Sequence, residues 1–97
     1  SVRETSPDKP LAYSLDQNYP NPFNPSTKIR FSVGTYGYTS LRVFDVLGKE
    51  IRMLVNENLK RGAYETTFDA AGLASGVYLY RLQSGDFVET QKLILLR

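Results

Sequence analysis

The chain has 97 residues and a mass of 11.0 kDa, which allows one domain with a single modest core. Its 12 basic and 10 acidic side chains are interspersed and give a formal charge of only +2, so the clustered basic face of a nucleic-acid-binding domain is missing. Hydrophobic residues make up 41% of the chain, and Val, Ile, Tyr and Phe are prominent among them, which favours pleated sheet.

Cysteine, histidine and tryptophan are absent from the sequence. The chain therefore has no thiol nucleophile, no imidazole base and no zinc ligands of the usual types. Asp45, Glu65, Asp69 and Asp86 lie in different predicted strands and turns, which indicates solvated surface charges. A calcium site of loop carboxylates stays open, although the D-x-D-x-D-G spacing is missing. We predict no enzymatic activity and no cofactor.

Residues 1–10 are polar and contain two prolines, a composition typical of a linker. We expect them to tether an upstream domain that this chain does not include, and residues 11–97 to form the domain itself. This start does not resemble a signal peptide, so any export signal is expected either upstream or to be of an unusual type. The longest aliphatic run, residues 93–96, is too short to span a membrane.

The next two elements are a short strand and a proline-rich segment. Residues 11–16 alternate apolar and polar side chains and predict the first strand. The proline-rich segment, residues 18–27, reads Asn-Tyr-Pro-Asn-Pro-Phe-Asn-Pro-Ser-Thr. Its prolines restrict φ and donate no N–H, so the segment can be neither helix nor interior strand. We expect an extended, turn-rich path in which Asn21 and Asn24 bond their own backbone.

Two aromatic residues, Tyr19 and Phe23, stand within the proline-rich segment. Large aromatic side chains have little reason to occur in a proline loop unless they pack against something. We interpret both as anchors that hold the segment across one end of a sheet sandwich. The alternative is that the segment is only a stiff connector.

The remainder of the chain reads as a succession of strands. Residues 27–33 alternate apolar and polar side chains with strict period two, which is typical of a half-buried strand. Gly48 and Lys49 suit a tight hairpin turn. Further strands are predicted at residues 40–47, 50–55, 63–69, 76–83 and 87–97, with connections at 34–39, 56–61 and 70–75. The run at 76–83 is densely apolar and predicts a central strand. Together these elements predict a seven-stranded antiparallel immunoglobulin-like β-sandwich; a small open barrel is the alternative.

Two local patterns suggest chemistry only weakly. Residues 72–76 are rich in glycine but lack the lysine and the helix of a phosphate-binding loop, and Ser75 has no base partner. Tyr36 and Tyr38 lie in a predicted loop where they can form a platform for a sugar. We favour the alternative that they pack at the rim of the sandwich with their hydroxyls in water.

Four stretches of the sequence have an order and spacing that resemble one known family. They are LDQNYPNPFNPSTKI at residues 15–29, LRVFDVLGKE at 41–50, LASGVYLYRL at 73–82 and KLILLR at 92–97. In combination they resemble the type A C-terminal sorting domain of the type IX (Por) secretion system, over nearly all of residues 11–97. The segment with the prolines is also similar to one in the Ig-like domain of flagellar hook-capping proteins. Phe44 stands where the family usually has Tyr, and Lys49 where Arg is common.

The resemblance implies a structural motif and a recognition element. The structural motif comprises Asn18, Tyr19, Pro20, Asn21, Pro22, Phe23, Asn24, Pro25, Gly48, Ser75, Gly76 and Tyr78. Recognition by an outer-membrane translocon is assigned to the last predicted strand, at Lys92, Leu93, Ile94, Leu95, Leu96 and Arg97. Such a strand can be recognised by pairing with an exposed strand edge. The alternative is that it only completes the core, and both can hold because alternate residues face opposite ways.

The resemblance also implies a route. A domain of this kind directs an N-terminal cargo domain from the periplasm through the translocon to the cell surface or the medium of a Bacteroidetes-type bacterium. A sortase-like peptidase then cuts in or near residues 1–10. Long edge strands favour strand exchange between copies, and hence a dimer. An Ig-like structural spacer and a carbohydrate-binding accessory module of a surface or flagellar protein stay open as other functions.

Overall fold

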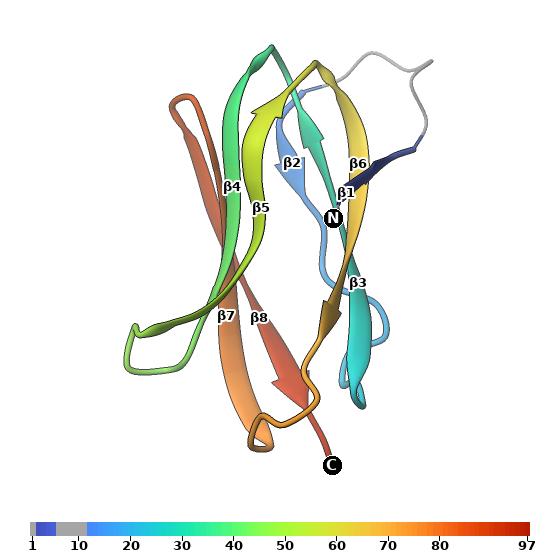
Figure 1. Cartoon of the computed structure of the whole chain (residues 1–97), viewed down its shortest axis with the longest axis vertical. Helices are drawn as coiled ribbons and strands as arrows, with labels where there is room; N and C mark the ends of the chain where they lie inside the picture. Colours follow the sequence, from blue (N-terminus) through green and yellow to red (C-terminus); the bar gives the residue numbers. More distant parts are fainter. Residues whose placement is uncertain (1, 6–11) are drawn as a thin grey trace.

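The computed structural model describes residues 2–5 and 12–97 of the chain. In this part the chain forms two antiparallel β-sheets that face each other, and it contains no helix (Figure 1). The strands are β1 (Val2–Glu4), β2 (Ser14–Leu15), β3 (Ser26–Val33), β4 (Gly37–Phe44), β5 (Glu50–Leu59), β6 (Gly62–Asp69), β7 (Gly76–Ser84) and β8 (Phe87–Leu95).

The two sheets each have four strands. The first sheet has the order β1-β6-β3-β2 and the second has the order β5-β4-β7-β8. The connections β3–β4, β5–β6 and β6–β7 pass from one sheet to the other, whereas β4–β5 and β7–β8 are hairpins within the second sheet. The prediction that residues 76–83 form a central strand is confirmed, because β7 lies between β4 and β8. Strand β8 is left at the edge of its sheet.

Period-two alternation decides which side chains fill the space between the sheets. In β3, Ile29, Phe31 and Val33 are buried, whereas Lys28 and Arg30 are exposed. The facing sheet contributes the fully buried side chains Leu41, Val43, Tyr80, Leu82, Leu93 and Leu95. Each side chain of this size that is removed from water stabilises the fold by about 1.5–3 kcal/mol, before the cost in conformational entropy.

Each of the seven predicted strands has a counterpart, and the all-β antiparallel class is confirmed. The predicted number of strands is wrong, because β1 is an eighth strand and pairs with β6. It occupies a stretch that the sequence predicts as linker, since its side chains are mostly polar and face solvent. Residue 1 and residues 6–11, which include most of that predicted linker and Leu11, lie outside the described residues.

Strands β4 and β5 differ from their predicted bounds. β5 continues to Leu59 through residues 56–58, which are exposed and polar and were therefore expected to form a loop. An edge strand tolerates this composition because only one of its sides needs pairing. β4 begins at Gly37, opposite Leu59, and ends at Phe44 instead of residue 47.

The turn between β4 and β5 is built around Asp45 and Gly48. The Asp45 Oδ1 atom accepts hydrogen bonds from the N–H groups of Leu47 and Lys49, each at 2.9 Å. Gly48 has a φ of +89°, which glycine adopts without strain. The predicted turn at Gly48 is confirmed. Asp45 shapes this turn, and Val46 and Leu47 are exposed at its tip instead of extending the strand.

Candidate recognition surface

Strand β8 and the two residues after it carry the side chains predicted for recognition by the translocon. These side chains divide between the two faces of the strand. Leu93 and Leu95 are fully buried and complete the core. The outward side chains, accessible in whole or in part, are Lys92, Ile94 and Leu96, while Arg97 is exposed and donates a hydrogen bond to the Leu73 carbonyl. A partner can therefore contact only one face of this strand.

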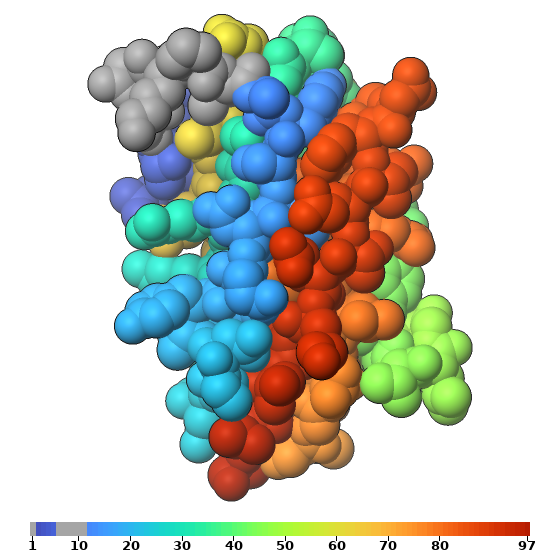
Figure 2. Space-filling model, turned by 180° about the vertical axis from the view of Figure 1, so that it is seen from behind, coloured from blue at the N-terminus to red at the C-terminus, as the bar shows by residue number. Residues whose placement is uncertain are grey.

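The outer edge of β8 is also closed at these residues, because the proline-rich segment lies along it (Figure 2). The Phe23 N–H donates to the Ile94 carbonyl at 3.0 Å, and the Leu96 N–H donates to the Phe23 carbonyl at 3.0 Å. The Ile94 N–H donates to Asn21 Oδ1 at 2.9 Å. This part of the segment therefore behaves as a short parallel neighbour of β8.

Two glutamine side chains add hydrogen bonds at this edge, and the one from Gln17 engages the backbone of β8. Gln17 Nε2 donates to the Lys92 carbonyl at 2.7 Å, and Gln91 Nε2 donates to the Leu15 carbonyl at 3.1 Å. Strand addition needs an edge whose backbone groups are unpaired. In the folded domain the Ile94 N–H and carbonyl, the Leu96 N–H and the Lys92 carbonyl already have hydrogen-bond partners, so a partner strand would have to displace them.

Tyr80 holds the entrance of the proline-rich segment. This fully buried side chain of β7 donates its hydroxyl proton to the Asp16 carbonyl at 2.7 Å and accepts the Asn18 N–H at 2.8 Å. Burial raises the pKa of Tyr80 to about 12, so the hydroxyl keeps its proton and remains a donor at neutral pH. The sequence predicts a central strand at residues 76–83 but does not indicate this polar role of Tyr80.

Asn18 and Thr27 close the base of the segment. The Asn18 side-chain amide donates to the Pro20 carbonyl at 3.1 Å and to Thr27 Oγ1 at 3.0 Å, and the Thr27 hydroxyl donates to the same carbonyl at 2.8 Å. Tyr19 and Lys28 exchange two backbone hydrogen bonds of 2.9 Å each. The segment is thus a loop whose two ends are joined at β3 and whose middle reaches β8.

The two predicted aromatic anchors behave differently. Phe23 is an anchor, since it is only 2% exposed and its ring centroid lies 5.9 Å from that of Phe68. Tyr19 is not, because its side chain is 80% exposed. Its backbone pairs with Lys28, and directly opposed residues of an antiparallel pair project to the same face, which here is the solvent.

The polar residues of the segment also depart from expectation. Asn21 bonds the backbone of β8 instead of its own, and the segment runs along a strand edge instead of across the end of the sandwich. Among the described residues, the Asn24 side chain has no hydrogen-bond partner, so its predicted local bond is absent. Pro20, Pro22 and Pro25 are exposed and follow cis peptide bonds.

The remaining motif residues lie at the end of the β6–β7 connection and in the first part of β7, which begins at Gly76. Tyr78 is buried, and its hydroxyl donates to the Ala74 carbonyl at 2.5 Å, which ties the loop to the start of β7. Ser75 is exposed, and Gly76 has a φ of +150° that a residue with a side chain rarely adopts. These residues shape the chain where it changes sheets.

The sequence model of one known family, described as the secretion system C-terminal sorting domain, matches residues 17–96. This range includes most of the surface described above; only Leu15, Asp16 and Arg97 lie just outside it. The chain belongs to the secretion system C-terminal sorting domain family. Its function is that of a C-terminal sorting signal for type IX secretion.

Family membership also bears on the other predictions. The sorting-domain family is not an enzyme family, and neither a structural spacer nor a carbohydrate-binding module is favoured by the match. A sorting domain implies a cargo protein and the secretion machinery as partners, and a secreted destination at the cell surface or outside the cell. No curated protein matches the chain.

Neither a membrane-spanning helix nor a metal site is found in the described part of the sorting domain. Within residues 2–5 and 12–97, no helix is long and apolar enough to cross a membrane. Over the same residues, no three acidic, histidine or cysteine side chains lie together in a way that can hold a metal ion.

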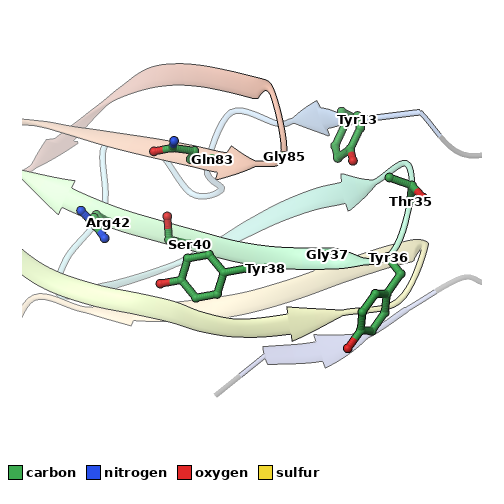
Figure 3. Close-up of a pocket in the computed structure, with 9 residues that line it drawn as sticks. All are labelled: Tyr13, Thr35, Tyr36, Gly37, Tyr38, Ser40, Arg42, Gln83 and Gly85. Atoms are coloured by element: carbon green, nitrogen blue, oxygen red, sulfur yellow. The ribbon is translucent and has the colours of Figure 1, made fainter.

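The sugar platform considered for Tyr36 and Tyr38 does not form. Both side chains are exposed and line a shallow pocket of about 440 Å³ between β4 and β7. Their rings extend in different directions, so they present no common plane (Figure 3). The Tyr38 hydroxyl donates to Asn56 Oδ1, a contact to the neighbouring strand β5. The Tyr38 hydroxyl is thus engaged within the sheet rather than only hydrated.

Glu65 occupies the centre of a charged cluster on the outer face of the first sheet. Its side chain is only 4% exposed, so the prediction of a solvated charge is wrong. Arg3 donates a hydrogen bond to Oε1, while Arg30 Nε and Lys28 Nζ lie 3.6 and 3.8 Å from Oε2. The hydrogen bond from Arg3 lowers the pKa of Glu65, and the nearby Lys28, Arg3 and Arg30 charges add to this against the effect of burial.

Replacing Glu65 with glutamine should reduce the loss of folding stability at acidic pH. The folded-state pKa lies below the ordinary value of 4.5, so the carboxylate stabilises the fold fully above that value, and this contribution is lost as the pH falls through the folded-state pKa. Urea unfolding between pH 7 and pH 3 should show a smaller decline for Glu65→Gln than for the unchanged domain. Glu57→Gln, at an exposed position of β5, is the control and should follow the unchanged domain. Parallel declines for all three proteins would contradict this assignment.

Proposed function

We propose that the sorting domain directs an exported cargo, joined to its N-terminal side, from the periplasm to the outer-membrane translocon of the type IX system and on to the cell surface of a Bacteroidetes-type bacterium. A sortase-like peptidase then separates the cargo by cutting in or near residues 1–10 and attaches it to the surface. The observation that carries the proposal is the family match over residues 17–96. The role of residues 92–97 is part of the proposal.

We also infer that the sandwich has an immunoglobulin-like topology. If β2 to β8 are lettered A to G, the sheets read A-B-E and D-C-F-G. A constant-type immunoglobulin domain has the sheets A-B-E-D and C-F-G, so only the fourth strand has changed sheets. The additional strand β1 pairs with β6 at the side where strand D lies in that domain. This accounts for an eighth strand without a different architecture.

The route can be tested with a reporter enzyme. We expect a reporter with an export signal, fused upstream of residues 1–97, to reach the surface or the medium of a bacterium that has the type IX system. The same reporter without the domain should stay in the periplasm, as should the fusion in a host that lacks the translocon. A folded fusion that remains in the periplasm of the competent host would refute the proposal.

Deletion of residues 92–97 would not distinguish lost recognition from unfolding of the domain. The deletion takes away Leu93 and Leu95, which are fully buried, together with the accessible side chains. A loss of secretion would then report unfolding as readily as lost recognition. Substitutions confined to one face of β8 separate the two causes.

A further inference from the structure

We propose that the secretion machinery recognises the sorting domain through side chains on the outer face of the second sheet, and not by pairing with a strand edge. The inference rests on the proposed function and names the surface that serves it. We call this surface the β7–β8 patch, and it comprises Val77, Leu79, Lys92, Ile94 and Leu96.

The backbone of β8 is already hydrogen-bonded at the recognition residues. Its outward groups at Ile94 bond Phe23 and Asn21, and the Lys92 carbonyl bonds Gln17. A partner strand would have to displace the proline-rich segment, including the buried Phe23 side chain. Recognition through side chains requires no such displacement.

The accessible side chains of β8 lie beside accessible side chains of β7. Val77 is paired with Ile94 and Leu79 with Lys92, whereas the intervening pair of Tyr78 and Leu93 is buried. Since alternate pairs face opposite sides, the first two pairs project outward together. Opposed side chains in such pairs lie about 5 Å apart, so they form a continuous strip.

This strip is more apolar than the solvent-facing side of an antiparallel sheet usually is. The solvated face of an antiparallel sheet is normally polar. Here Val77 is 40% exposed and Leu96 53% exposed, and Ile94 and Leu79 are half-buried beside them. Contiguous exposed apolar side chains bordered by charge mark interaction sites.

The charges at the border indicate the chemistry of the partner. Lys92 lies within the patch, and Arg81 follows Leu79 on the same face of β7, with its guanidinium 4.6 Å from the centre of the Phe44 ring. In the described part of the chain, neither cation has a carboxylate within ion-pair distance. The patch therefore fits an apolar protein surface that presents a carboxylate to Lys92.

The other end of β8 supplies a matched control. Val88 is 53% exposed and pairs with Gln83, so it projects to the same outer face in polar surroundings. Val88→Thr replaces a methyl group with a hydroxyl, as Val77→Thr does within the patch. It makes this change at an outward-facing valine of the same sheet that lies outside the patch.

The test measures how fast the reporter fusion appears in the medium or at the surface in a pulse–chase experiment. We expect the double variant Val77→Thr/Ile94→Thr and the single variant Lys92→Glu to slow secretion at least about tenfold each, which corresponds to about 1.4 kcal/mol of lost binding. Lys92→Arg and Val88→Thr should be secreted at the unchanged rate. All variants should stay folded, with a midpoint of urea unfolding close to that of the unchanged domain, since no substituted side chain belongs to the buried core.

Several outcomes would overturn the proposal. Secretion of Val77→Thr/Ile94→Thr at the unchanged rate, while a reporter without the domain is retained, refutes the patch and leaves the proposed function standing. An equal loss from Val88→Thr shows that recognition is not localised to the patch. A dimer that becomes monomeric in the double variant without a change in secretion assigns the patch to a second copy of the chain. Retention of the unchanged fusion refutes the proposed function itself.

Discussion

Replacing Phe23 with alanine is expected to lower the free energy of unfolding by about 3–5 kcal/mol, the range for a large aromatic side chain removed from a core. Phe23 is 2% exposed and packs on Phe68 of β6, while its own backbone makes both hydrogen bonds of the parallel bridge to β8. The loss of its ring should therefore loosen the segment that covers the edge of β8. Urea or thermal unfolding of the isolated domain measures the change.

The control lies four residues away in the same proline-rich segment. Tyr19→Ala removes a side chain of similar size that is 80% exposed, and we expect a change within about 0.5 kcal/mol. Equal changes in the free energy of unfolding would show that the buried ring of Phe23 contributes no more to the fold than the exposed ring of Tyr19. The anchoring role of Phe23 would then be wrong.

Leu93→Ala should cost about 2–5 kcal/mol, because the side chain is fully buried between the two sheets. Leu96→Ala, three residues later on the outer side, should change the free energy of unfolding by no more than about 0.5 kcal/mol. The same pair of variants separates the structural role of the last strand from its role in recognition. Equal losses of stability, measured by urea unfolding, would show that the two faces are not distinct.

The strands could be predicted because their side chains alternate with period two and the intervening turns have suitable residues. In β3 the order of Ile29, Phe31 and Val33 against lysine and arginine already states which face is buried. The same alternation puts Leu93 and Leu95 on one face of the last strand and Lys92 and Ile94 on the other. Local pattern is sufficient here, because one residue of slip would turn every side chain to the wrong face.

What could not be predicted depends on residues that are distant in sequence. Tyr19 and Phe23 stand in nearly the same proline-rich context, and only the pairing of Tyr19 with Lys28 decides that one is exposed and the other buried. The partner of Asn21 is the backbone of Ile94, which no local turn preference indicates. Glu65 is buried because long cations from β1 and β3 cover it, and β1 itself lacks an apolar pattern.

The hydrogen bonds between the first and last parts of the domain join residues separated by 73 to 76 positions, as in Asn21 with Ile94 and Leu15 with Gln91. A polypeptide leaves the ribosome, or threads through a pore, from its N-terminal side, and contacts of such high sequence separation form late. Residues 15–23 can therefore pair with β3 early, but their contacts with β8 form only after residues 91–96 have also emerged. The domain can complete its fold only after its final strand has emerged. A completed fold therefore requires that the whole domain has left the ribosome or pore.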